Sequence, residues 1–173
     1  MFENLQVDID SLPSVQKVKM TKLVSAYKYK ILLANVIVMI ILAIVSASFS
    51  YFIISEGYGW VIPWMFVFVI ALPAIIVMLG FLAFQKKRYA LRDKDIIYNS
   101  GLITHHQISV PINRIQHVEI QQGLLDKALN LANLDIFTAG GSGSDLRIPG
   151  LRPETAEKIR SFLLKKLEFD EEE

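Results

Sequence analysis

Three histidines are the residues of this chain best suited to metal binding or general acid–base chemistry. His105 and His106 are adjacent, so in a strand their side chains point to opposite faces and cannot easily bind one metal ion. His117 stands in a separate stretch without an acidic cluster to join it, and the sequence contains no cysteine. Disulfides and thiolate chemistry are therefore excluded, and we interpret the histidines as structural or surface residues.

A second candidate is the segment AGGSGSD at positions 139–145, whose glycines could cradle a phosphate. It lacks the following Lys and helix that a phosphate-binding loop requires, and glycines do not flank a Ser as in a nucleophile elbow. Nothing in the spacing supports a triad of Ser144, Asp145 and a histidine. We predict a β-hairpin turn here, and no catalytic, metal-binding or cofactor-binding residues in the chain.

Basic residues form the third candidate, and they flank two long apolar runs. The five that we select are Lys28, Lys30, Lys86, Lys87 and Arg88. One interpretation is that they fix membrane topology and anchor the chain. The other is contact with anionic lipid headgroups, worth ~1 kcal/mol per charge near such a surface, and the two are compatible. Basic–aromatic strand motifs and helix-turn-helix patterns are absent, so we expect no nucleic-acid partner.

Arg114 is the last single residue of interest, because it lies in the segment PINRI, which interrupts the alternation of apolar residues. Its five donors could bind backbone carbonyls and fix a bend at Asn113–Arg114. It could instead face a partner, and the sequence leaves both roles open.

Two long apolar runs without charge lie between these basic residues and determine where they lie. Ile31–Ser55 and Gly57–Gln85 each exceed the ~20 residues of a spanning helix, in a chain that is 53% hydrophobic. They predict membrane helices at about 31–54 and 60–84. A signal peptide fits poorly, because the first run begins late and a second follows at once. A buried pair of core helices is the other alternative, which the absence of charge disfavours.

Lysine and arginine flank both runs on their outer sides and are absent from the short connection, which places both termini in the cytoplasm. We therefore expect a multi-pass protein of the inner or plasma membrane with a cytoplasmic segment at 1–30. Small residues at Ala43, Ala47 and Ser50 would allow close packing of another helix. Neither run holds Asp, Glu, Lys, Arg or His, which argues against a transporter or channel formed by this chain alone.

Residues 86–167 have the composition and apolar alternation of a soluble, mainly-β domain. Charged residues at 92–95 predict a hairpin turn, and Ile108, Val110 and Ile112 alternate on one strand face. A short helical turn follows Gly123, and Asn130 suits a left-handed closing position. An amphipathic helix begins at Pro153 and presents one apolar face, before an acidic tail at 168–173. The apolar residues of that face are Ala156, Ile159, Phe162, Leu163 and Leu167.

This domain resembles the pleckstrin-homology-like (PH-like) domain of the bacterial YdbS/YdbT membrane proteins. The features that carry the resemblance are Arg88-Tyr89 at the first strand, Gly101, the segment PINRI before QHVEI, and QGLLDKALNLANLDIFTAG. One departure is Asn130, where the family commonly has Gly. The resemblance implies a membrane helical hairpin joined to a bent antiparallel β-sandwich or barrel, capped by a C-terminal helix. It implies no catalytic residues.

We therefore expect a non-enzymatic membrane protein whose domain serves binding or assembly, as a subunit or accessory of a membrane complex. The basic residues make membrane lipids one expected partner. The resemblance suggests a larger YdbT-type protein or a second copy of the chain as the other. The alternative is a lipid-binding, lipid-modifying or transport-associated subunit. The sequence offers no paired carboxylates for acid–base work at the membrane boundary.

Overall fold

A long helical hairpin and a β-domain make up the computed structural model, which describes residues 18–55, 57–139 and 145–171. Helix α1 (Tyr27–Ser55) packs along α2 (Ile62–Lys86), and the 3-10 turn η3 (Gly59–Val61) precedes α2. Both helices are long and apolar enough to cross a membrane, and little of either is buried inside the protein. That exposure distinguishes them from the core helices of a soluble protein, and the apolar surface requires a nonaqueous environment.

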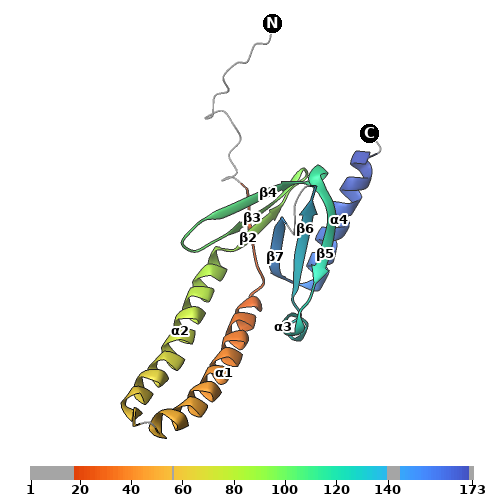
Figure 1. The fold of residues 1–173 in the computed structure, drawn as a ribbon. Coiled ribbons are helices and arrows are strands. Elements are labelled where there is room, and N and C mark those ends of the chain that lie inside the picture. The colour runs from red at the N-terminus through yellow and green to blue at the C-terminus, as the bar shows by residue number, and fades with distance from the viewer. Residues whose placement is uncertain (1–17, 56, 140–144, 172–173) are drawn as a thin grey trace.

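Two antiparallel sheets form the β-domain (Figure 1). The first has the order β1-β2-β3-β4 and the second β5-β6-β7. The strands of the first sheet are Thr21–Lys22, Arg88–Leu91, Asp95–Ser100 and His106–Pro111. Those of the second are Ile115–Gln121, Ala132–Thr138 and Leu146–Leu151. The turn η4 (Ile112–Arg114) carries the chain from one sheet to the other, as expected for the bend at Asn113–Arg114.

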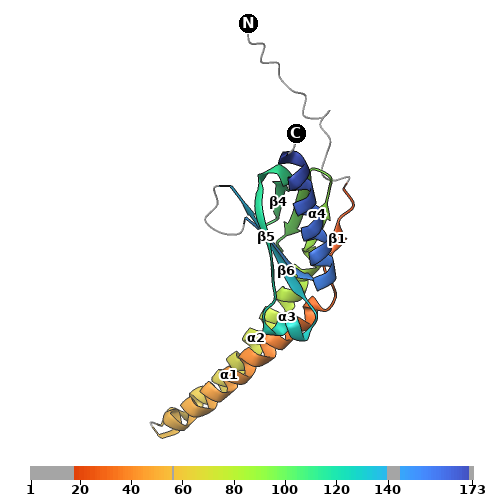
Figure 2. The same ribbon diagram turned by 90° about the vertical axis from the view of Figure 1, so that its right-hand side faces the viewer.

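The domain core lies between the sheets and under helix α4 (Pro153–Glu171). Ala156, Ile159 and Leu163 are buried, so the predicted apolar face of this helix is confirmed. Helix α4 contacts β5, β6 and η4 and thereby covers the open side of the second sheet, as Figure 2 shows. The predicted architecture of a membrane hairpin followed by a capped β-domain is correct.

Strand β1 is the main feature that the sequence did not indicate. Thr21 pairs with Tyr89 and Lys22 with Arg88, so residues before the hairpin complete the first sheet. Leu23 is 5% exposed and belongs to the domain core. The sequence predicts a domain that begins at Lys86, whereas in the structure the helical hairpin is inserted between two adjacent strands of one sheet.

Turn chemistry agrees with the sequence at two positions. Asn130 has a φ of 51°, and it follows α3 (Leu124–Ala128) in the expected left-handed conformation. Gly101 has a φ of 104° in the β3–β4 turn, where an added Cβ would lie 1.8 Å from the Thr104 carbonyl oxygen. Only glycine fits that turn.

Two expectations differ from the structure. Ile108 is 39% exposed, although Val110 and Ile112 are buried, because the outer part of the β3–β4 hairpin extends past the second sheet (Figure 1). The expected acidic tail is helical as far as Glu171, since α4 continues through it. The glycine-rich turn at 140–144 lies outside the described residues, although β6 and β7 on either side of it pair antiparallel.

Candidate membrane-proximal basic pocket

The ends of the two long helices that lie next to the β-domain meet at an aromatic contact. The rings of Tyr27 and Phe84 stack with centroids 5.8 Å apart. Tyr27 also packs on Gly150, where an added Cβ would lie 2.6 Å from Tyr27 Cδ2. The Val24 amide donates to the Gly150 carbonyl at 3.3 Å, so the base of the hairpin is attached directly to β7.

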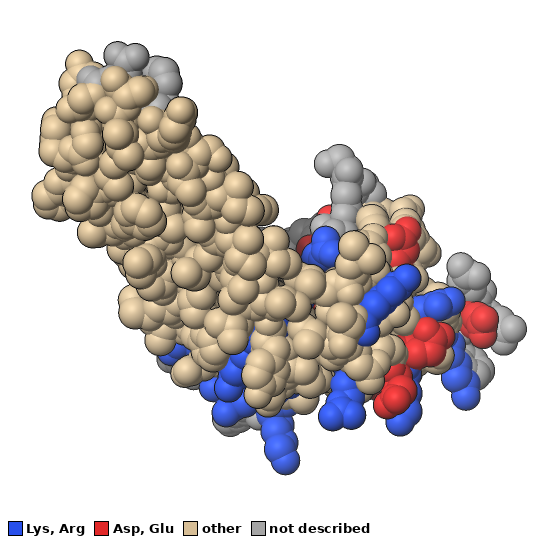
Figure 3. Space-filling view, turned by 90° about the horizontal axis from the view of Figure 1, so that it is seen from below, with Lys and Arg blue, Asp and Glu red and all other residues tan. Residues whose placement is uncertain are grey.

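A pocket of about 510 Å³ opens beside this contact, between the segment before α1 and the end of α2. Ser25, Gln85 and two apolar side chains contribute to its lining. The other five lining residues are cations: Lys22, Lys28, Lys86, Lys87 and Arg88. The residues that line it include no acid. Figure 3 shows where these charges lie: the hairpin surface is uncharged, and Lys and Arg side chains, drawn in blue, gather at its base.

Two lysines of the pocket lie over the aromatic rings. Lys28 Nζ is 5.4 Å from the Phe84 centroid, and Lys87 Nζ is 5.1 Å from that of Tyr27. Lys87 Nζ also donates to the Tyr27 hydroxyl at 3.4 Å. The rings hold the ammonium groups in place by cation–π attraction. The arrangement can bind an anion, and the lining residues include neither a carboxylate nor a histidine to serve as general base.

The structure thus brings together four of the five cations that we selected and adds Lys22. The fifth, Lys30, lies outside the pocket and forms an ion pair with Asp126, with Nζ 2.6 Å from Oδ1. Asp126 also accepts from the Gly123 amide at 3.2 Å and from Asn133 Nδ2 at 3.1 Å. Lys30 therefore joins the first turn of α1 to α3.

Asp126 is 3% exposed, so its ionisation state depends on these partners. Burial raises the pKa of Asp126, whereas Lys30, Gly123 and Asn133 lower it, and the resulting pKa lies below the ordinary value of 3.8. The carboxylate stays charged at neutral pH. The sequence does not indicate a role for Asp126, because its partner Lys30 is nearly a hundred residues away along the chain, at the start of the membrane hairpin.

The predicted helix-packing residues of α1 differ in exposure. Ala43 and Ala47 are exposed, although α2 packs along α1. Ser50 is partly buried, and its hydroxyl donates to the Ser46 carbonyl at 2.8 Å. Ser46 itself is buried. The alanines are therefore open to another helix, and the serines are largely covered.

Arg114 is exposed in η4. Its carbonyl oxygen accepts from the Ala139 amide at 3.3 Å. Among the described residues its guanidinium has neither a hydrogen-bond nor an ion-pair partner. The described residues thus show no loop-fixing contact of this side chain, and its contact with a partner stays a prediction.

His105 directly precedes β4, His106 is the first residue of that strand, and His117 lies in β5. His105 and His106 are exposed, and the His117 ring stacks on Phe137 with centroids 4.1 Å apart. His117 Nε2 lies 3.5 Å from Glu119 Oε1. In the described part of the chain no group of three or more metal-ligating side chains comes together.

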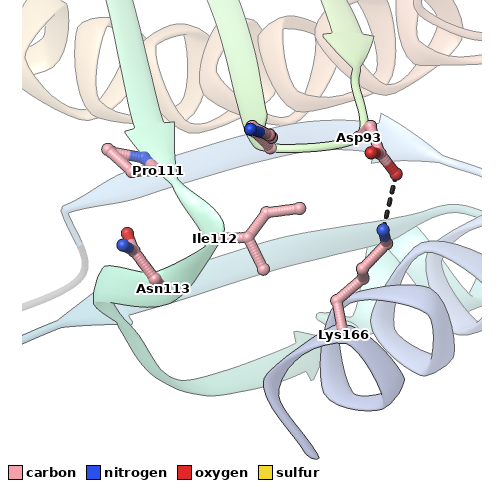
Figure 4. Close-up of a pocket in the computed structure, with 6 residues that line it drawn as sticks. Asp93, Pro111, Ile112, Asn113 and Lys166 are labelled. Atoms are coloured by element: carbon pink, nitrogen blue, oxygen red, sulfur yellow. Dashed lines mark ion pairs between the residues drawn. The ribbon is translucent and has the colours of Figure 1, made fainter. Parts of the chain in front are cut away.

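A second pocket, of about 450 Å³, lies between the β2–β3 turn, η4 and α4 (Figure 4). Asp93 and Lys166 form an ion pair across it at 2.6 Å. The hydrogen bond from Lys166 lowers the pKa of the exposed Asp93 carboxyl. The remaining lining residues are Lys94, Pro111, Ile112 and Asn113, and they include neither a carboxylate nor a histidine. We interpret this pocket as structural, because its ion pair holds α4 against the β2–β3 turn.

Comparisons with known proteins agree with the fold. Residues 11–167 match the family model described as bacterial PH domain. The UPF0699 transmembrane protein YdbS of Bacillus subtilis (strain 168) is 37% identical over 76 residues, which cover 44% of this chain and 46% of that protein. The chain therefore aligns with less than half the length of this curated relative. No solved structure matches the chain. The predicted resemblance is confirmed: the chain belongs to the bacterial PH domain family, and it is a YdbS-like transmembrane protein.

Proposed function

We propose that this protein is a non-enzymatic subunit or accessory of a membrane complex. Its two helices span the membrane, both termini are cytoplasmic, and the PH-like domain serves as an assembly module. The partner is a larger membrane protein with several such domains, or a second copy of this chain. The lining of the basic pocket holds neither a carboxylate nor a histidine, which supports a non-catalytic role.

The exposed alanine pair on α1 is the observation that carries the assembly proposal. Ala43 and Ala47 lie one turn apart on the apolar surface that α2 leaves uncovered. Small residues at this spacing let helix backbones approach closely in lipid. Strand β4 offers a second contact, because it forms an outer edge of the first sheet in the described structure. Such an edge can pair with a strand of a partner.

The alanine pair is tested by replacing Ala43 and Ala47 with Leu and measuring the size of the complex in mild detergent. We expect the complex to dissociate, because the larger side chains separate the helices. The matched control replaces Ala71 and Ala74, which are exposed on α2, in the same way. Equal behaviour of the two variants would exclude the alanine pair as the contact.

Topology is tested with single cysteines, which this cysteine-free chain allows. Gly59 suits the outer position, since an added Cβ there meets nothing within 4 Å. Leu164, on the exposed side of α4, suits the inner position. In intact cells an impermeant thiol reagent should label Gly59→Cys and leave Leu164→Cys unlabelled until lysis. Labelling of Leu164→Cys before lysis would refute the cytoplasmic C-terminus.

The second candidate function is recognition of anionic phospholipid headgroups, and the cationic pocket favours it. Near an anionic surface each cation adds ~1 kcal/mol. Native mass spectrometry in detergent would measure retained phosphatidylglycerol. The variant with Lys28→Gln and Lys86→Gln should lose it, and a control with Arg152→Gln and Lys158→Gln should keep it. Equal retention by both variants would remove the pocket from consideration.

A further inference from the structure

Two apolar side chains protrude from the β-domain without a protein contact that explains them. Ile103 is 92% exposed in the β3–β4 turn, and Leu124 is 89% exposed at the start of α3. They are the most exposed large hydrophobic side chains of the described domain. Isolated exposed leucines are common on protein surfaces, so their position relative to the hairpin decides whether they have a role.

Leu124 lies at the level where the apolar part of α1 begins. Asp126, two residues further along α3, is held by Lys30 of α1 at 2.6 Å. The next residue of α1 is Ile31, the first of the long uncharged run. Figures 1 and 2 both place α3 beside the first turns of α1, at the end of the β-domain nearest the hairpin. A membrane that covers the apolar run from Ile31 therefore reaches α3.

Ile103 lies on the opposite side of the hairpin. Strand β3 contacts the end of α2, and the β3–β4 hairpin projects beyond α2 on the side away from α3 (Figure 1). The tight turn at Gly101 fixes the direction of this tip. The two apolar tips and the hairpin between them are thus arranged to meet one surface.

Charge at both tips is compatible with an anionic membrane. Residues 101–105, GLITH, contain no acid. The acid of α3, Asp126, is buried and neutralised by Lys30, whereas Lys127 is exposed. An exposed hydrophobic residue beside a lysine is typical of segments that lie in the membrane interface.

We propose that Ile103 and Leu124 insert into the headgroup region of the cytoplasmic leaflet, so that the PH-like domain lies against the bilayer at three places. The hairpin supplies the central contact and the two tips supply those on either side. This arrangement restricts the tilt of the domain and fixes which sheet edge faces a partner. The proposal rests on the membrane topology proposed above.

Fluorescent labelling of single cysteines in the full-length chain tests the insertion. Ile103→Cys and Leu124→Cys would each carry an environment-sensitive dye, in vesicles of phosphatidylglycerol and phosphatidylethanolamine. Both side chains are exposed, so the dye should not disturb packing. We expect blue-shifted emission, and quenching by lipids with a nitroxide near the headgroup several-fold stronger than for a dye at Leu164 of α4.

A dye at Val67, an exposed residue within α2, separates failure of this proposal from failure of the proposed topology. Quenching at Val67 with a water-like signal at a tip would overturn the insertion of that tip and leave the spanning helices intact. A water-like signal at Val67 would overturn the topology itself. Blue-shifted emission at a tip without quenching by nitroxide lipids would show that protein covers the tip, which also refutes the proposal.

Discussion

Removing the ion pair between Lys30 and Asp126 should loosen the β-domain from the membrane hairpin. Asp126 has a side chain 4% exposed and Lys30 one 26% exposed, with 2.6 Å between the charged atoms. Exposed pairs contribute about 0.2–1 kcal/mol, and losing one partner of a buried pair costs about 3–5 kcal/mol. This pair lies between these limits. We expect Lys30→Met and Asp126→Asn each to lower the free energy of unfolding by about 2 kcal/mol.

The double variant should lose little more than either single variant, which gives a coupling energy of about 1–2 kcal/mol. Pulse proteolysis in urea and mild detergent would measure unfolding of the β-domain in the full-length chain. Lys127→Met is the control, because it removes an exposed charge from the same helix and should change stability by less than about 0.5 kcal/mol. A coupling energy below about 0.5 kcal/mol would refute the inferred attachment.

Acid should weaken the same contact. The folded-state pKa of Asp126 lies below 3.8, so protonation favours the unfolded state. The stabilisation is fully present above the ordinary pKa and is lost as the pH falls through the lower folded-state value. The stability difference between the wild type and Asp126→Asn should therefore shrink below pH 3.8. If the stability difference stayed constant until Asp126 is fully protonated, a lowered pKa of this carboxyl group would be contradicted.

Other predictions concern packing. Ile112→Asp should unfold the β-domain, as measured by protease resistance, because Ile112 is buried and a buried unpaired charge is costly. His106→Ala, at an exposed position, should change stability by less than about 0.5 kcal/mol, and a larger loss would contradict a surface role. Gly150→Ala should destabilise by about 1–3 kcal/mol in urea, since its φ is +66° and Tyr27 occupies the space. Gly59→Ala, in open space, should be nearly neutral, and equal effects at both glycines would refute the packing argument.

Local signals in the sequence were sufficient for the elements that form within a few residues of each other. The charged residues at 92–95 predicted the β2–β3 turn, where Arg92 donates from its backbone amide to the Asp95 carbonyl at 2.9 Å. Pro153 predicted the start of α4, and helical spacing predicted its buried face. The uncharged runs predicted both long helices, because length and the absence of charge are sufficient evidence for such segments.

Contacts across the hairpin could not be predicted in this way. Strand β1 has two residues and no visible alternation, and its partner Arg88–Leu91 lies beyond both long helices. The basic residues were selected for their place beside apolar runs. The sequence could not separate Lys30, which pairs with Asp126, from the cations that line the pocket. Ile108 shares the alternation of Val110, but the length of an overhanging hairpin is set by tertiary structure.

Because the membrane hairpin lies between β1 and β2 in the chain, folding of the first sheet is coupled to membrane insertion of the hairpin. A flexible loop of roughly 65 residues between Lys22 and Arg88 would cost on the order of 4 kcal/mol to close. Two paired helices bring those ends together once they are inserted, so the membrane acts as the template on which the first sheet is completed. A chain that fails to insert leaves Leu23 out of the core and the edge of β2 unpaired. Such a chain exposes an unpaired strand and apolar surface, which chaperones and proteases recognise. Completion of the first sheet therefore depends on correct membrane insertion.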